Sequence, residues 1–318
     1  MNAEPLASPA FTVVMPAYNA GGTIGDAIRS VLAQTEPDFE LIVVDDGSTD
    51  DTPEEVGRFV SDRRVRLIRQ RNAGLAATRN RGVHEGGGRY VSFLDSDDLL
   101  VPTYLATMHA TLAKAPDAAF ADCDFWILDD ATGRISTWPL GRLDLPRDPY
   151  ELMRLVLRRN VLHYGATARM GILRDVGLFN AKLRACEDVE LWLRILAHGH
   201  SGVRAPGRLT VYRSRRGSLS TQAVLMTSSL CEVYRLVAEE YDVPEDIRAL
   251  AERRKRAEAR RLQALTNERR LAGAGERMRR KLGRARRAMR RPGRAHEVPP
   301  ELAAALPGLV RQRDPSSG

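Results

Sequence analysis

The sequence has few cysteines, and they stand far apart. Cys123, Cys186 and Cys231 are the three that it contains, and no two of them have the spacing of a metal-binding pair. Thiols this few and scattered are typical of proteins in a reducing compartment such as the cytoplasm. The cysteine content therefore excludes a disulfide-rich fold and a cysteine-based zinc site.

Long apolar runs are also missing. No segment of the 318-residue chain approaches the about 20 apolar residues that a membrane-spanning helix needs. Residues 1–10 lack the basic start and the apolar core of a secretory signal, so we expect no secretion and a cytoplasmic location. The hydrophobic content of 43% is nevertheless normal for a globular protein, and the length allows one or two domains.

Two glycine motifs that bind phosphate are absent as well. The sequence contains no G-x-x-x-x-G-K-[ST] and no G-x-G-x-x-G after a predicted strand. Both motifs place backbone N–H groups around a phosphate, so their absence argues against an ATPase and against a dehydrogenase.

Apolar runs alternate with segments of helical spacing over the first hundred residues. The expected strands are Phe11–Pro16, Phe39–Val44, Val65–Ile68 and Tyr90–Leu94. One intervening helix has a predicted capping box, with Thr52 as the cap, Pro53 at the first helical position and Glu55 closing the box. This alternation predicts an α/β fold with a mostly parallel sheet, in which ligands bind beyond the carboxyl ends of the strands.

Polar side chains gather at that predicted edge of the sheet. The segments Pro16–Tyr18, Asp45-Asp46 and Asp95–Asp97 each follow a strand, and Asn72 and Arg79 lie on a neighbouring connection. An aromatic ring suits a nucleobase, carboxylates suit N–H and hydroxyl donors, and an arginine with a metal suits a diphosphate. The pattern predicts a nucleotide site without a phosphate-binding glycine loop.

Three carboxylates stand close together in Asp95-Ser96-Asp97-Asp98. Like charges this close repel one another, and a divalent cation such as Mg²⁺ resolves that repulsion together with substrate phosphates. The alternative is helix capping, but Asp95 and Asp97 are too far from the helix expected at Pro102–Lys114 to cap it. A short turn capped by Asp98 stays open, and we favour the metal site.

The chain resembles the inverting family 2 glycosyltransferases of the GT-A fold over residues 11–222. The matching segments are Val13–Asn19, Glu40–Asp50, Arg71–Asn80, Phe93–Asp98, Val176–Phe179, Glu187–Arg194 and Tyr212–Ser220. Their order and spacing carry the resemblance. It implies that a sugar moves from a nucleotide-diphosphate sugar, with a UDP-sugar as the first expectation, to an acceptor hydroxyl with inversion. A glycan, a lipid-linked molecule or a small molecule would be the acceptor.

The resemblance also implies roles for individual residues. The nucleotide would contact Pro16, Ala17, Tyr18, Asp45, Asp46, Asn72, Arg79, Asp95 and Ser96. Asp97 would hold Mg²⁺ or Mn²⁺ against the diphosphate, and Asp188 would be the general base. Glu187 and Trp192 are candidates for phosphate or acceptor contacts. Taken alone, Glu187-Asp188 would be the ordinary acidic first turn of a helix, but its place within the family's motif favours catalysis.

The chain departs from the family in one segment. Members often carry a histidine between the positions of Tyr212 and Ser220, in some cases as a metal ligand, whereas Arg215 and Arg216 stand here. A guanidinium does not bind a metal ion, so the metal would have fewer protein ligands. Either arginine would contact phosphate directly, or both belong to a solvated basic loop, and the sequence favours neither interpretation.

The net charge of +8 is concentrated near the end of the chain, between Arg248 and Arg294. We expect residues 11–222 to form the GT-A domain, with 11–100 binding the nucleotide and 101–222 the acceptor. Residues 223–291 would form a basic helical extension, and 1–10 and 292–318 would be disordered. A basic helix suits an anionic membrane surface or nucleic acid, and a simply solvated helix is equally open.

The enzyme interpretation favours peripheral membrane attachment of residues 248–294 over nucleic-acid binding. Two rival functions remain. One is a nucleic-acid-binding protein that acts through its arginine-rich helices. The other is an inactive scaffold that binds a nucleotide sugar without transferring it.

Overall fold

A computed structural model describes residues 8–137, 144–162, 165–215 and 218–279 of the chain. Over these residues the strands are β1 (Phe11–Ala17), β2 (Phe39–Asp45), β3 (Val65–Arg69), β4 (Tyr90–Phe93), β5 (Leu99–Leu100), β6 (Ala118–Asp129), β7 (Arg134–Thr137), β8 (Thr167–Arg169) and β9 (Ser201–Ser214). The helices are α1 (Ile24–Leu32), α2 (Thr52–Gly57), α3 (Leu75–Glu85), α4 (Tyr104–Lys114), α5 (Pro149–Arg158), α6 (Met170–Asp175), α7 (Glu187–Ala197), α8 (Ala223–Glu239) and α9 (Glu245–Arg279), with a 3-10 turn η1 (Leu219–Thr221).

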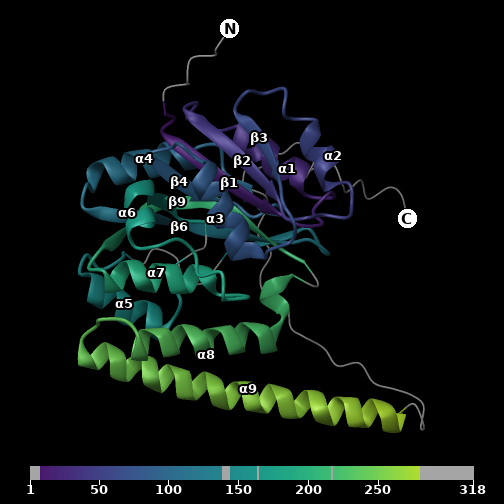
Figure 1. Ribbon diagram of the computed structural model, residues 1–318, viewed down its shortest axis with the longest axis vertical. Coiled ribbons are helices and arrows are strands. Elements are labelled where there is room, and N and C mark those ends of the chain that lie inside the picture. Colours follow the sequence, from purple (N-terminus) through teal and green to yellow (C-terminus); the bar gives the residue numbers. More distant parts are fainter. Residues whose placement is uncertain (1–7, 138–143, 163–164, 216–217, 280–318) are drawn as a thin grey trace.

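The described strands form one sheet between two layers of helices (Figure 1). The strand order is β3-β2-β1-β4-β8-β6-β9-β5, and β7 pairs with β6 at the side. One core cluster packs α1, α2 and α4 against the sheet, and a second packs α3 and α5 to α9 against the opposite face. The two clusters are the apolar faces that the strands and the amphipathic helices bury against each other.

The first half of the sheet is parallel, as the alternating pattern predicted. β1 is buried along its whole length, and it pairs in parallel with β2 and β4. The register places Ala17 opposite Asp45 and Val14 opposite Phe93, so these three strands end at one edge. Buried parallel strands read as continuous apolar runs, which is why their positions were visible in the sequence.

The second half of the sheet is mixed. β8 runs antiparallel to β4 and β6, β5 runs antiparallel to β9, and β6 and β9 are parallel. β8 and β5 are too short to show a periodic pattern, so these antiparallel pairs could not be predicted from the sequence.

The predicted capping box at Thr52 is wrong. α2 begins at Thr52, its N-cap is Asp51, and no side chain caps it. The Thr52 hydroxyl instead accepts a hydrogen bond from the Ala20 N–H at 2.8 Å and donates one to Asp50 at 2.5 Å. The hydroxyl therefore ties the turn after β2 to the turn after β1, a tertiary use that local sequence does not reveal. The helix expected from Pro102 begins at Tyr104.

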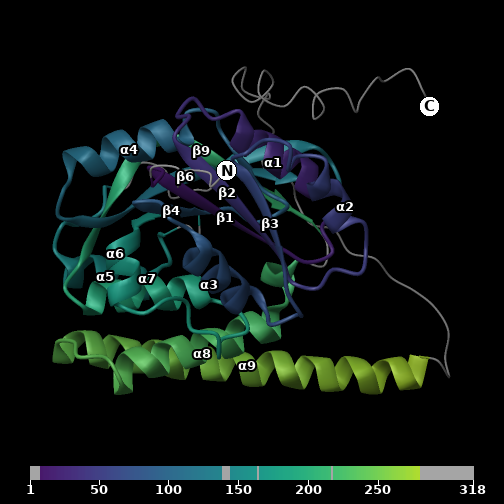
Figure 2. The ribbon, with the colours of Figure 1, turned by 45° about the horizontal axis from the view of Figure 1, so that its top comes forward.

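Helices α8 and α9 form a hairpin along one side of the molecule (Figures 1 and 2). Val233 and Val237 of α8 and Ile247 and Ala251 of α9 are fully buried in the same core cluster as α5 and α7. The core therefore crosses residue 222, the boundary that the sequence suggested for the GT-A domain. No helix in the described part of the chain is both long enough and apolar enough to cross a membrane.

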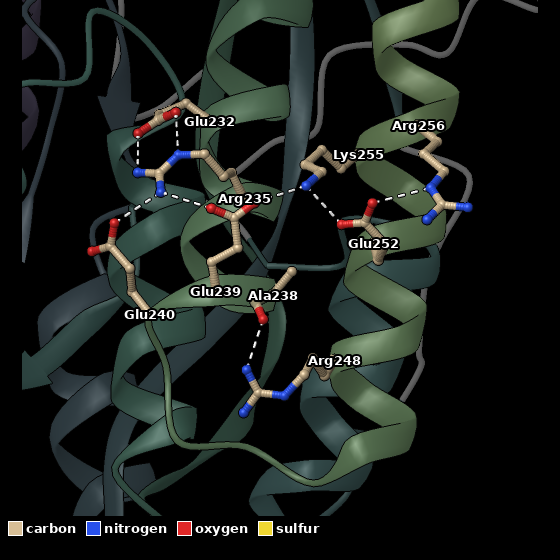
Figure 3. A network of polar contacts seen from close by, with 9 residues as sticks. All are labelled: Glu232, Arg235, Ala238, Glu239, Glu240, Arg248, Glu252, Lys255 and Arg256. Carbon is tan, nitrogen blue, oxygen red and sulfur yellow. Dashed lines mark hydrogen bonds and ion pairs between the residues drawn. The ribbon is translucent and has the colours of Figure 1, made fainter.

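A network of polar contacts runs along the hairpin, and one ion pair in it, between Lys255 and Glu239, joins the two helices (Figure 3). Arg235 pairs with three glutamates of α8 and its end, Glu232, Glu239 and Glu240. Lys255 of α9 reaches Glu239 at 2.8 Å and Glu252 at 2.7 Å. Exposed pairs contribute little each, so the buried apolar residues supply most of the hairpin's stability. The expected tail at 292–318 lies outside the described residues, as do residues 280–291 and 1–7.

Two alanines of α9 test this interpretation of the hairpin. Ala251 is fully buried, whereas Ala259 is exposed. We expect Ala251→Asp to lower the free energy of unfolding by roughly 2–4 kcal/mol, because it places an unpaired carboxylate in the core. Ala259→Asp should change it by less than about 1 kcal/mol. Thermal unfolding followed by circular dichroism measures both, and equal melting temperatures would contradict the shared core.

Candidate active site

A pocket of about 490 Å³ opens at the carboxyl ends of β1, β2 and β4. Its other walls come from the start of α3, the start of α7, the end of β9 and the first turn of α8. The parallel register explains the position, since it brings several loops to the same edge of the sheet. Among the described residues, the pocket thus collects side chains that are far apart in the chain.

The end of β1 presents an aromatic ring to this pocket. Pro16, Ala17 and Tyr18 line it, and Tyr18 is 52% exposed. Asn19, which follows, has a left-handed backbone with φ of 51°. Its side-chain oxygen accepts a hydrogen bond from the Thr49 N–H at 2.9 Å, which fastens this turn to the one after β2. An exposed ring on a fixed turn is suited to stacking on a planar base.

The two carboxylates after β2 have different surroundings. Asp45 is fully buried, accepts a hydrogen bond from the Ser48 N–H at 3.0 Å and pairs with Arg69 at 3.2 Å. It does not line the pocket, whereas Asp46 does. Asp46 accepts hydrogen bonds from the N–H groups of Ala73 and Gly74 at 2.8 and 2.9 Å. Asp46 therefore shapes the loop that brings Asn72 to the pocket wall.

Arg79 of α3 is the buried cation of the site. Its two terminal nitrogens contact Glu187 at 2.5 Å and Asp95 at 2.6 Å. Burial lowers the pKa of Arg79, but the charges of Asp95, Glu187 and Asp188 outweigh that effect and raise it. Arg79 thus stays charged and joins the turn after β4 to the start of α7. The sequence suggested that Arg79 faces a diphosphate. In the structure, both of its terminal nitrogens contact carboxylates.

The three carboxylates after β4 separate into two groups. Asp95, Ser96 and Asp97 line the pocket, whereas Asp98 is buried and accepts a hydrogen bond from the Arg213 N–H at 2.6 Å. Burial and the charges of Asp97 and Asp95 raise the pKa of Asp98 well above its usual range.

Asp97 pairs with Arg215, whose Nε lies 2.9 Å from a carboxylate oxygen. Burial and the charge of Asp95 raise the pKa of Asp97 in spite of this partner. In the described part of the chain, no group of three or more His, Cys, Asp or Glu is placed to hold a metal ion.

Glu187 and Asp188 begin α7, where acidic residues are favourable. Glu187 is buried against Arg79, and Asp188 is partly exposed and lines the pocket. Burial raises the pKa of both carboxyls, Asp95 adds to this effect, and Arg79 opposes it. A carboxylate with a raised pKa is a stronger proton acceptor than an ordinary aspartate.

The remaining predicted site residues lie elsewhere. Trp192 is in the core, 1% exposed, with its ring 4.9 Å from that of Phe120, and it does not line the pocket. Arg216 lies outside the described residues. Sequence reasoning missed Leu219 and Met226, which give the pocket an apolar wall. Leu219 lies in the matching segment Tyr212–Ser220 but received no role there, and Met226 is a single apolar residue of α8 that gives no signal of a site.

Comparison with known proteins identifies the family of this chain. The model of the family described as Glycosyl transferase family 2 matches residues 12–176, about half of the chain. The succinoglycan biosynthesis protein ExoO of Rhizobium meliloti is 33% identical over 224 residues, which cover 67% of this chain and 63% of that protein. An uncharacterised glycosyltransferase of Escherichia coli, YibD, is 37% identical over 135 residues, 42% of this chain and 39% of that protein. The matched segment therefore spans less than two thirds of either relative.

Solved structures share the fold. Staphylococcus aureus TarS 1-349 in complex with UDP-GlcNAc has a TM-score of 0.63 and 20% identity, and the match covers 77% of this chain and 72% of that one. The mannosyltransferase PcManGT of Pyrobaculum calidifontis, in complex with GDP-Man and Mn²⁺, has a TM-score of 0.59 and 19% identity over 87% of this chain and 82% of that one. The chain has the GT-A fold of these transferases, and with its family model matched over about half of its length it belongs to the family 2 glycosyltransferases.

Proposed function

We propose that the protein transfers a sugar from a nucleoside-diphosphate sugar to an acceptor hydroxyl, with inversion. One observation carries the proposal. The exposed ring of Tyr18, the carboxylates of Asp95 and Asp97, and the carboxylate of Asp188 all line the same pocket. The ring suits a nucleobase, Asp95 suits the ribose hydroxyls, and Asp97 suits a metal ion that binds the diphosphate. Asp188 suits the acceptor hydroxyl. Family membership supports transfer over passive binding of a nucleotide sugar.

The donor would lie with its base on Tyr18 and its ribose near Asp95. Related structures hold UDP-GlcNAc in one protein and GDP-Man with Mn²⁺ in another, so both nucleotide types are candidates, and we propose UDP first. Asp97 would hold Mg²⁺ or Mn²⁺, which when bound supplies positive charge to the leaving diphosphate. Because the described residues offer few ligands, such an ion would depend on phosphate oxygens for the rest of its coordination.

Asp188 would accept the proton of the attacking hydroxyl. Inversion requires a base on the face of the sugar opposite the leaving group, and Asp188, at the start of α7, lines the same pocket as Asp95 and Asp97. Glu187 would not act on the substrate directly, since its carboxylate is committed to Arg79 at 2.5 Å. Its contact holds the first turn of α7, and with it Asp188, toward the pocket. Leu219 and Met226 would contact an acceptor with an apolar part.

Replacing Tyr18 tests the position of the base. We expect one nucleotide among UDP, dTDP, GDP and ADP to raise the melting temperature of the wild type by mass action. Tyr18→Ala should weaken that nucleotide's binding about tenfold or more, because stacking on an aromatic ring contributes about 1–3 kcal/mol per base. The matched control is Val60→Ala, which truncates another exposed apolar side chain, 47% exposed and outside the pocket. A Tyr18→Ala protein that binds as tightly as the wild type would place the base elsewhere.

Replacing Asp188 tests its role as the general base. Asp188→Asn should lower the turnover number by about 10²–10⁴, the usual contribution of a positioned general base. Nucleotide binding should change by less than about threefold, because the substitution keeps the shape of the side chain. Release of nucleoside diphosphate in the presence of a panel of acceptors measures the turnover number, and titration calorimetry measures nucleotide binding. Asp175→Asn, an exposed carboxylate outside the pocket, is the control. Unchanged turnover in Asp188→Asn would remove Asp188 from the mechanism.

The pH dependence of the rate gives an independent test. A base must be deprotonated to act, and the pKa of Asp188 is raised, so the rate should fall as the pH is lowered through that raised value. The fall should therefore begin above a pH of about 4, where an ordinary aspartate titrates. Because the pKa of Glu187 is also raised, the midpoint belongs to the pair. Circular dichroism over the same range checks that the fold persists. A flat rate down to about pH 4 would argue against this base.

A further inference from the structure

The end of β9 is fastened to the acidic turn after β4. The Arg213 N–H donates to Asp98 at 2.6 Å, and the Arg213 Nε donates to the Asp97 carbonyl at 2.9 Å. Asp98 is buried, so this anchor lies away from water, where hydrogen bonds are electrostatically stronger. The chain that follows Arg213 therefore enters the pocket beside Asp97.

Arg215 lies beside Asp97 in the pocket. Its Nε lies 2.9 Å from Asp97, with 36% of the Arg215 side chain and 18% of the Asp97 side chain exposed, and both residues line the pocket. A guanidinium keeps its charge at every relevant pH, and its planar set of N–H donors matches phosphate as well as carboxylate. With Nε on Asp97, the terminal nitrogens carry four further N–H donors.

The carboxylates at this place are already engaged with arginines. Asp95 contacts Arg79 at 2.6 Å, and Asp97 contacts Arg215. The described residues place no third His, Cys, Asp or Glu beside these two carboxylates that would complete a metal site. A divalent ion would share Asp97 with a permanent positive charge a few ångströms away, and the two cations repel each other.

We propose that Arg215 is a resident cation of the donor site, which contacts the diphosphate and supplies part of the charge that a divalent ion would otherwise provide. A nucleoside diphosphate then binds without a metal ion, and a metal adds little to its affinity. This inference rests on the proposed function, because it assumes that the pocket takes a nucleoside diphosphate.

Titration calorimetry on the full chain with UDP, and with GDP as a second probe, tests the proposal. In the wild type, the dissociation constant in EDTA and in Mn²⁺ should differ by less than about threefold. Arg215→Gln should bind about tenfold or more weakly in EDTA, because a charge-assisted contact to phosphate is lost, and Mn²⁺ should largely restore it. The control is Arg58→Gln, which removes the same charge from an exposed pair with Glu55 and should bind as the wild type does.

A second measurement does not involve the nucleotide. Arg215→His replaces the cation with an imidazole, which ligates metals, so this variant should bind Mn²⁺ at least about tenfold more tightly than the wild type in the absence of nucleotide. The electron paramagnetic resonance signal of free Mn²⁺ reports that binding. Melting temperatures of all variants check that they are folded.

The outcomes separate the two proposals. If wild-type UDP binding disappears in EDTA, or if Arg215→Gln binds UDP in EDTA as tightly as the wild type does, the role of Arg215 is wrong while the nucleotide site stands. If folded wild-type protein binds none of UDP, dTDP, GDP and ADP under any condition, both proposals fail.

Discussion

The buried guanidinium of Arg79 is the interaction on which the site depends. It joins three separate parts of the chain, because α3 carries it, Asp95 follows β4, and Glu187 begins α7. A buried cation is costly to desolvate, and only well-placed carboxylates offset that cost. Glu187 depends on Arg79 in the same way, since removal of Arg79 would leave Glu187 buried with its charge uncompensated. The turn after β4 and the helix of the candidate base are therefore held in one arrangement.

Arginines of different exposure contact the three carboxylates after β4. Arg79 is 2% exposed and serves as internal structure, whereas Arg215 is 36% exposed and faces the pocket. Between them, Arg213 bonds Asp98 through its backbone and so holds the acidic turn against β9. A cluster of carboxylates that would repel one another is thereby converted into two pocket-facing groups, each beside a cation, and one buried group. In the proposed mechanism, proton transfer falls to Asp188, whose carboxyl has a raised pKa.

The sequence predicted the sheet edge well but not the use of each residue there. Continuous apolar runs identified β1, β2 and β4, and parallel pairing then required their ends to meet. The difference between Asp45 and Asp46 was hidden, because adjacent residues at a strand end point to opposite sides and only the packing decides which side is the pocket. The pair of Arg215 and Asp97 was equally hidden, since it depends on how β9 docks against the turn after β4. Trp192 lies in the core because α7 is packed on most of its sides, which its acidic start does not reveal.

The helical hairpin of α8 and α9 is tied to the site through α7. Tyr241, between the two helices, donates a hydrogen bond to Glu190 of α7, and Arg194 contacts the same carboxylate at 2.8 Å. Met226 of α8 lines the pocket, and its carbonyl accepts a hydrogen bond from Cys186, the residue before Glu187. Any shift of the hairpin would therefore move the first turn of α7, which carries Asp188, the proposed base. The basic extension, whatever its arginines bind, is part of the body that positions the candidate base.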